Sequence, residues 1–423
     1  MSQFAKAVYP VPNRYLDLGK EVTPGTIAAA TYTFPMTTFK PVDKYTMLPD
    51  SAWRNAMGDL YNYIQGVRIA DISMGGPFFA DGMGYPLANI LGDYYQGVAA
   101  GTVGTQTQIS VSSAVGAGTI VVTNATSITV GELISLGGTA TTACEVRKVS
   151  TVTGTTPGTI VLSANLYQAH SSSAASGTIQ AWSGYNGILH NFALLNNGLG
   201  AGGWTASQPP TYTYYDYSGV PATYGARQYG YSCFSEVTIT SDPTKLLEWD
   251  GKMEALASQI SSSTPSVSLS AVAPQAAWEA TVNLAGAGTL NCSMFKLTLQ
   301  RKLSPKYTNS GQQDFFALPR GYLSAMLSLD FDPASDESEF LYYLNNTQPT
   351  CVLTAVNGLS GSAAASLTIT ANQIGFDSGE LNDSKDVFGF DMAAKLVDNT
   401  TNVGPSGGFG PCIVSLQNSV VSY

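Results

Sequence analysis

The residue types that most often carry catalysis or bind metals are sparse and scattered in this chain. The two histidines, His170 and His190, occur in unrelated contexts, and neither belongs to an H-x-x-x-H, H-E-x-x-H or Cys-His arrangement. A metal site or an activated nucleophile needs such spacings, because its side chains must converge on one atom. We therefore expect a protein that is not an enzyme and that binds no metal and no cofactor.

Glycine-rich stretches and a cluster of acids also suggest chemistry, but simpler interpretations suit them. Glycines near 75–77 and 200–203 lack the G-x-G-x-x-G spacing of a phosphate-binding loop between a strand and a helix, so loops are expected there. Asp332 followed by Pro333 favours an N-cap and the first position of a short helix. The remaining acids of the cluster lack the spacing of a calcium-binding loop and would lie at or near the start of this helix: Asp330, Asp336, Glu337 and Glu339.

The cysteines are odd in number and widely spaced, and four of the five sit in strand-like runs. They are Cys144, Cys233, Cys292, Cys351 and Cys412. The pattern predicts buried free thiols in preference to disulfides or a metal site.

Composition narrows the class of protein. Of 423 residues, 44% are hydrophobic and only 11% are charged, and the net charge is −10. Charged residues usually make up about 25% of a chain. Their scarcity is typical of surfaces that copies of the same protein cover, although an ordinary β-rich extracellular domain would also fit. The negative charge disfavours binding to nucleic acid through phosphate neutralisation. Since no secretion signal and no run of about 18 apolar residues occurs, we expect cytoplasmic folding without a membrane span.

The chain contains an apparent duplication, with five elements in the same order. A strand over 294–301, a loop, a strand over 322–331 and a short helix match a strand over 32–39, a loop, a strand over 66–73 and a helix that contains Pro86 and stops at Gly92. The two loops share the sequence Lys-Tyr-Thr, at Lys44, Tyr45 and Thr46 and at Lys306, Tyr307 and Thr308. Residues 237–240 and 367–370 would close the two units.

These patterns predict a domain order. An N-terminal arm (1–30) precedes a first unit (31–98 with 184–260), which is interrupted by a surface β domain (99–183) rich in Gly, Ser, Thr, Ala and Val. A linker (261–277), a second unit (278–400) and a C-terminal arm or strand (401–423) follow. A long aromatic segment in the first unit is expected to form an interface, with candidates Trp204, Tyr212, Tyr214, Tyr215 and Tyr217.

Several short pieces resemble the tail tube (major tail) proteins of long-tailed, non-contractile phages. They are Leu194-Leu-Asn, Gln208-Pro-Pro-Thr-Tyr-Thr, Gly225-Ala-Arg-Gln-Tyr-Gly, Glu236-Val-Thr-Ile-Thr, Leu299-Gln-Arg-Lys-Leu and Asn345-Asn-Thr-Gln. The inserted module is similar to small β modules of phage virion proteins. The resemblance implies a mainly β fold with two tandem β-sandwich or half-barrel domains, each with a short flanking helix, plus an inserted all-β domain.

The resemblance also implies a function. Rings of the protein would stack into the tail tube, the channel that delivers the genome, and the loops 40–66 and 302–321 would reach the next ring. A trimeric ring with pseudo-sixfold symmetry is expected, with a homohexamer as the alternative. The inward faces of 67–73, 237–240, 323–331 and 367–370 would line the bore, through which double-stranded DNA passes without specific binding. Further partners would be the tape measure protein and the tail tip or terminator proteins, and the location would be the virion tail.

Two other classes fit the sequence. A secreted or surface adhesin or carbohydrate-binding protein would explain the tyrosines and the inserted module, but it would normally need a secretion signal. Another virion protein, such as a capsid decoration protein, would share the composition without requiring the duplicated unit.

Overall fold

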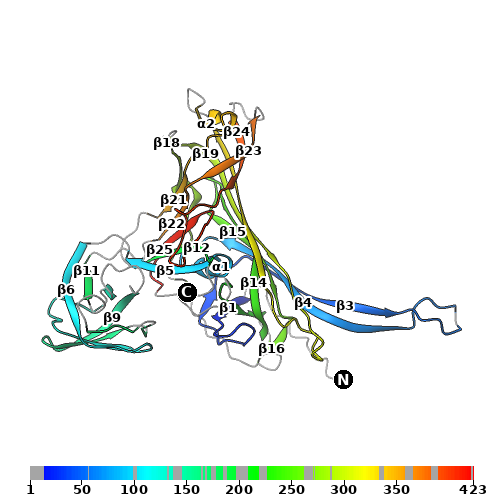
Figure 1. The fold of residues 1–423 in the computed structure, drawn as a ribbon, viewed down its shortest axis with the longest axis horizontal. Helices are drawn as coiled ribbons and strands as arrows, with labels where there is room; N and C mark the ends of the chain where they lie inside the picture. Colours follow the sequence, from blue (N-terminus) through cyan, green and yellow to red (C-terminus); the bar gives the residue numbers. More distant parts are fainter. Residues whose placement is uncertain are drawn as a thin grey trace, which may run out of the picture.

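The fold is mainly β, as predicted, with two sheets packed face to face and a separate small barrel (Figure 1). The computed structural model describes residues 14–55, 57–98, 102–130, 133–136, 145–162, 165–166, 169–172, 178–183, 188–196, 208–218, 226–261, 270, 272–285, 288–332, 338–357, 365–382, 389–420 and 423.

The larger sheet contains a path of eight antiparallel strands. In spatial order they are β3 (Thr38–Asp50), β4 (Asn62–Pro77), β15 (Glu248–Ala255), β14 (Ala226–Ser241), β19 (Asn291–Leu303), β20 (Arg320–Asp332), β24 (Gly389–Leu396) and β23 (Ile374–Asn382). The first half of β14 also pairs with β13 (Tyr212–Tyr217) and β16 (Gln259–Ser261), and β13 continues to β1 (Tyr15–Lys20) and β2 (Tyr32–Phe34).

The second sheet has seven strands and combines both predicted units. Its order is β18 (Gly288–Thr289), β17 (Ala280–Leu284), β21 (Cys351–Val356), β22 (Ser366–Ala371), β25 (Ile413–Asn418), β12 (Ile188–Leu194) and β5 (Gly92–Val98). Period-two alternation explains why the two sheets pack together, because one face of each strand is apolar. In β19, for example, Phe295, Leu297 and Leu299 are buried, whereas the residues between them are at least partly exposed.

The predicted inserted domain is a closed six-stranded barrel. Its strands are β6 (Thr102–Val111), β7 (Thr119–Val122), β8 (Leu133–Leu136), β9 (Glu145–Thr153), β10 (Gly158–Leu162) and β11 (Thr178–Ser183). It has an apolar core of its own, with Ile120, Ile134 and Ile160 fully buried. Figure 1 shows the barrel beside the two sheets, next to β5. Closure removes the exposed strand edges that so small a sheet would otherwise present.

Two short α-helices occur in the described chain, α1 (Gly84–Ile90) and α2 (Ser338–Leu344), together with a 3-10 turn, η2 (Ala277–Glu279). The first agrees with the sequence: Pro86 lies in its first turn, and Gly92 adopts a φ of 93° just after it. The prediction of an N-cap at Asp332 is wrong, because that residue belongs to β20. Pro333, Asp336 and Glu337, predicted for the start of the same helix, lie outside the described residues, and Glu339 lies in α2 (Ser338–Leu344). Cross-strand pairing of Asp332 with Asn291 prevails over the local capping preference.

The predicted domains and arms need correction, since one apolar core runs through both units. The two units are halves of one sandwich and not separate domains. Residues 15–20 form β1, within a sheet, so the predicted N-terminal arm does not extend over them. The predicted C-terminal arm contains β25, a central strand between β22 and β12, and Tyr423 is buried against α1. Long-range strand pairing, which local sequence does not reveal, decides all three outcomes.

Candidate functional site

The eight-stranded path contains the same four-strand pattern twice. Each unit contributes one long hairpin and then a second hairpin with its strands in reversed order, β3-β4-β15-β14 followed by β19-β20-β24-β23. A β-bulge recurs at the same place, with one extra residue at Ser235 in β14 and at Asp377 in β23. Each extra residue directly follows a phenylalanine, Phe234 or Phe376. This repeat of order and register supports the predicted duplication.

The register also gives the residue equivalences. A second shared bulge has its extra residue in β4, between Gln65 and Arg68, and in β20, between Arg320 and Leu323. It places Phe39 with Phe295 and Lys40 with Lys296. The register therefore contradicts two predicted matches. The strand 294–301 corresponds to 38–45 and not to 32–39, of which 32–34 form β2. The match of Lys44-Tyr45-Thr46 with Lys306-Tyr307-Thr308 is wrong as well. The first triplet lies inside β3 and the second in the loop after β19.

The predicted match of 237–240 with 367–370 is also wrong. Residues 367–370 belong to β22 in the second sheet. Counted from the shared bulge, the residues of the second unit that correspond to 237–240 of β14 are 379–382 of β23. The similar strings Val-Thr-Ile-Thr and Leu-Thr-Ile-Thr reflect the shared alternation of buried strands and not common position. Of the four stretches expected to line a bore, 367–370 is thus excluded, while 67–73, 237–240 and 323–331 share the larger sheet.

Both ends of the eight-stranded path are unpaired in the described chain. β3 pairs only with β4, and β23 pairs only with β24. An unpaired edge exposes a row of backbone N–H and C=O groups and is a template for pairing with another chain. Since all neighbours along the path are antiparallel, β3 and β23 run in opposite directions, and β23 of one copy could extend onto β3 of another without breaking the alternation.

The face of the path that points away from the second sheet is polar and carries more acids than bases. Its acids are Asp71, Glu236, Glu248, Asp250, Glu254, Asp330, Glu380 and Asp391, and its bases are Lys40, Lys44, Lys252, Lys296 and Lys395. Three of these lysines form ion pairs: Lys44 with Asp71, Lys252 with Glu236 at 2.9 Å and Lys395 with Asp377 at 2.7 Å. This face therefore attracts a polyanion only weakly.

The hairpin of β3 and β4 extends well beyond the body of the molecule (Figure 1). It exposes large apolar side chains along its length: Val42, Tyr45, Met47, Leu48, Trp53, Met57, Leu60, Tyr63 and Ile64. They occupy both faces of the hairpin. Leu48 lies opposite Ile64 on one face, and the next pair, Pro49 and Tyr63, lies on the other face. A two-stranded ribbon is marginal by itself in water, and an exposed apolar patch of this kind marks an interaction site.

The second unit has no such projection, because its loop between β19 and β20 folds back onto β4. Asp314 accepts two hydrogen bonds from Arg68, at 2.6 and 2.8 Å, and the Arg68 N–H donates to Gln313 O at 3.0 Å. Gln313 Nε2 in turn donates to Gln65 O at 3.2 Å. Of the predicted inter-ring residues, Lys44, Tyr45 and Thr46 thus lie in the root of the projecting hairpin, whereas Lys306, Tyr307 and Thr308 lie in the folded-back loop.

The tyrosines predicted to form an interface are buried instead. Tyr212, Tyr214, Tyr215 and Tyr217 belong to β13, whose six residues are all buried. The first two pack on one side of the sheet, where Tyr85 and Phe234 contact them, and the other two stack on the opposite side. Aromatic residues suit cores and interfaces equally, so composition could not separate these roles. Trp204 lies outside the described residues.

The described residues whose side chains could carry chemistry, His190 and the cysteines, pack against other side chains of the fold. His190 is fully buried beside Tyr94, with 2.8 Å between Nδ1 and the hydroxyl oxygen, and burial lowers its pKa to about 3. Cys233, Cys292, Cys351 and Cys412 are free thiols, three of them buried; Cys144 lies outside the described residues. Within the part of the chain that the structure describes, no three His, Cys, Asp or Glu side chains converge as a metal site would require.

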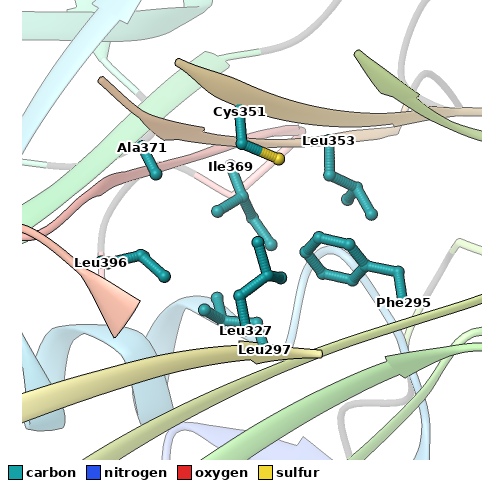
Figure 2. Close-up of a pocket in the computed structure, with 8 residues that line it drawn as sticks. All are labelled: Phe295, Leu297, Leu327, Cys351, Leu353, Ile369, Ala371 and Leu396. Carbon is teal, nitrogen blue, oxygen red and sulfur yellow. The ribbon is translucent and has the colours of Figure 1, made fainter. Parts of the chain in front are cut away.

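Among the described residues, one enclosed gap lies between the two sheets and one open depression lies on the surface. Figure 2 shows the gap between the two sheets, where Phe295, Leu297 and Leu327 face Cys351 and Leu353. With a volume of about 10 Å³ it is a packing defect, and its apolar lining gives a water too few hydrogen-bond partners. An open depression of about 330 Å³ lies between β4 and the folded-back loop.

No helix among the described residues is both long and apolar enough to cross a bilayer. Comparison with known proteins identifies no relative in sequence: no family model matches, and no curated protein matches. Among solved structures, the phage phi92 endosialidase aligns with 89% of this chain at 9% identity and a TM-score of 0.13. The chain spans only 56% of that protein, and a similarity this low carries no argument about fold or function.

Proposed function

We propose that this protein is a structural virion protein that polymerises as stacked rings into a phage tail tube, the channel for genome delivery. The observation that carries the proposal is the repeated four-strand unit in a sheet whose two outer strands, β3 and β23, are both open. Contacts between two different edges are heterologous, and such contacts generate a closed ring when the rotation between copies closes. Ring closure would also remove the edges, which otherwise promote aggregation.

The continuity of the sheet favours a trimer over a hexamer with one lining unit, because both units face the same side. Three copies would supply 24 strands. With strands ~4.8 Å apart and tilted by ~40°, such a wall has a backbone diameter of about 48 Å. The excess of acids on the open face, with most lysines paired, suits a wall along which DNA slides, since binding through released counterions needs free cations.

The projecting hairpin would connect successive rings. Its apolar residues on both faces need cover, and a neighbouring ring supplies it without a further partner. The tape measure protein and the tail tip or terminator proteins would then meet the ends of the tube.

Native mass spectrometry and electron microscopy of the purified protein test the proposal. We expect a particle of three times the 44.4 kDa chain mass, and stacked rings at higher concentration. The variant Trp53→Ser/Met57→Ser should still form rings but should not stack them, because both side chains are fully exposed on the hairpin. Val115→Ser, an exposed apolar position in the barrel, is the matched control and should stack normally. A protein that stays monomeric at every concentration would refute the proposal.

A further inference from the structure

Inside its own sheet, the chain already pairs the last strand of one four-strand unit with the first strand of the other. β14 closes the first unit and β19 opens the second, and they pair antiparallel with Val237 opposite Leu299 and Thr238 opposite Thr298. By the shared bulges, β14 corresponds to β23 and β19 corresponds to β3. The internal junction is therefore a template for a junction between two copies.

We infer that β23 of one copy pairs with β3 of the next copy in the register of the internal junction, with Glu380 opposite Val42. This inference rests on the proposed ring and specifies its contact. Thr238 and Thr298 occupy the equivalent positions inside the chain. Both strands are long enough, since β23 has nine residues and β3 has thirteen.

Exposure at the two edges fits this register. Leu381 corresponds to Ile239, which is 1% exposed at the internal junction, but Leu381 itself is 56% exposed. An apolar side chain on the core face of an edge strand gains free energy when a neighbouring strand covers it. Its partner would be Pro41, which lacks an N–H, so this position of the junction between copies cannot donate a backbone hydrogen bond as Leu297 can inside the chain.

Charge at the two edges is complementary. Opposite Val42, Glu380 would have Lys40 and Lys44 of the next copy as its diagonal neighbours, at about 7–8 Å between Cα atoms. Since Lys44 already pairs with Asp71, Lys40 contributes most of the attraction. Inside the chain the corresponding position is the uncharged Thr238. All three charged groups are at the surface, so their attraction depends on ionic strength.

The internal junction has a reinforcement that the junction between copies lacks. Arg301 donates to Ile90 O at 2.9 Å, and Arg320 donates to Pro209 O at 2.6 Å, so two buried arginines of the second unit hold the first. Their equivalents in the first unit are Tyr45 and Gln65, which are uncharged and exposed. The ring therefore has two kinds of junction, and the one between copies is the weaker and the more sensitive to salt.

Disulfide trapping tests the register. The full-length double variant Val42→Cys/Glu380→Cys should form covalent oligomers on mild oxidation, up to a closed set of three chains, because directly opposite Cβ atoms lie about 4.5–5.5 Å apart. The control Tyr45→Cys/Glu380→Cys places the cysteine three residues away and on the other face, and it should not cross-link. Rings that form in native mass spectrometry but cross-link through Tyr45→Cys, or through neither pair, would overturn the inferred register while leaving the proposed function intact. Absence of rings in the unmodified protein would remove the proposed function itself.

Salt dependence provides a second readout. Glu380→Gln should weaken ring association by about threefold to tenfold at low salt and should match the unmodified protein near 1 M salt, because surface pairs are weak and screened. Glu248→Gln removes an exposed acid from the same face, in the inner strand β15, and should leave association unchanged. Equal weakening by both variants, or none by either, would show that Glu380 does not meet the lysines of β3.

Discussion

Burial of His190 predicts a specific loss of stability in acid. The pKa of this imidazole falls from 6.5 to about 3 because the ring is fully buried, so the folded state binds its proton only in strong acid. The unfolded state takes up the proton near pH 6.5, so between pH 6.5 and 3 it binds more protons than the folded state. The contribution of neutral His190 to the free energy of unfolding is therefore fully present above pH 6.5, the pKa in the unfolded chain. It is lost as the pH falls below that value. At about 1.36 kcal/mol per pKa unit, the loss is about 2 kcal/mol at pH 5.

Urea unfolding at pH 7, 6 and 5 measures this loss, with His190→Gln for comparison. Buried acids such as Asp17 and Asp93 work in the opposite direction, since burial raises their pKa and acid then favours the folded state. The difference between the unmodified protein and the variant isolates the histidine. The destabilising effect of His190→Gln should shrink by about 2 kcal/mol between pH 7 and 5. The control Phe192→Leu removes packing beside Tyr94 without changing titration, and its effect should be independent of pH. Parallel pH profiles for His190→Gln and the unmodified protein would refute the reasoning.

Three further changes test the packing. Arg320→Met should destabilise the fold by about 3 kcal/mol in urea unfolding, because buried carbonyls lose a charged donor; a change below about 1 kcal/mol would contradict the role of this residue in joining the units. Gly84→Ala should cost about 2 kcal/mol, since the new Cβ would clash with the ring of Tyr423. Its combination with Tyr423→Ala should be less destabilised than the sum of the two single variants, and strict additivity would show that the residues do not clash. Arg68→Ala should cost about 1 kcal/mol or less and should speed proteolysis of the loop 304–319, because the partly exposed pair with Asp314 holds that loop on β4; an unchanged cleavage rate would mean that other contacts hold it.

Local pattern was a good guide wherever one strand or turn decides the outcome. Alternation located β19 and β20, Pro86 and Gly92 bounded α1, and composition separated the barrel from the sheets. The order of two long strands followed by a short helix suggested the repeat, although the Lys-Tyr-Thr loops and the closing strands matched from sequence are not equivalent. These features depend on neighbours in sequence, which a single chain displays directly.

Tertiary structure alone decided which strands meet and which surfaces remain open. The sequence favoured 367–370 as the counterpart of 237–240 in the second unit, but both stretches only show the alternation common to buried strands. The strand pairing shows that the counterpart lies in β23. Likewise, tyrosines such as Tyr212 and Tyr214 are common at interfaces. Both lie in the core because β13 is covered on both faces. The sequence by itself determined a duplicated, mainly β chain with few charges. Only the fold decided that the two units share one sheet, that β3 and β23 end it, and that one hairpin projects while its counterpart folds back, because each of these depends on contacts between residues distant along the chain.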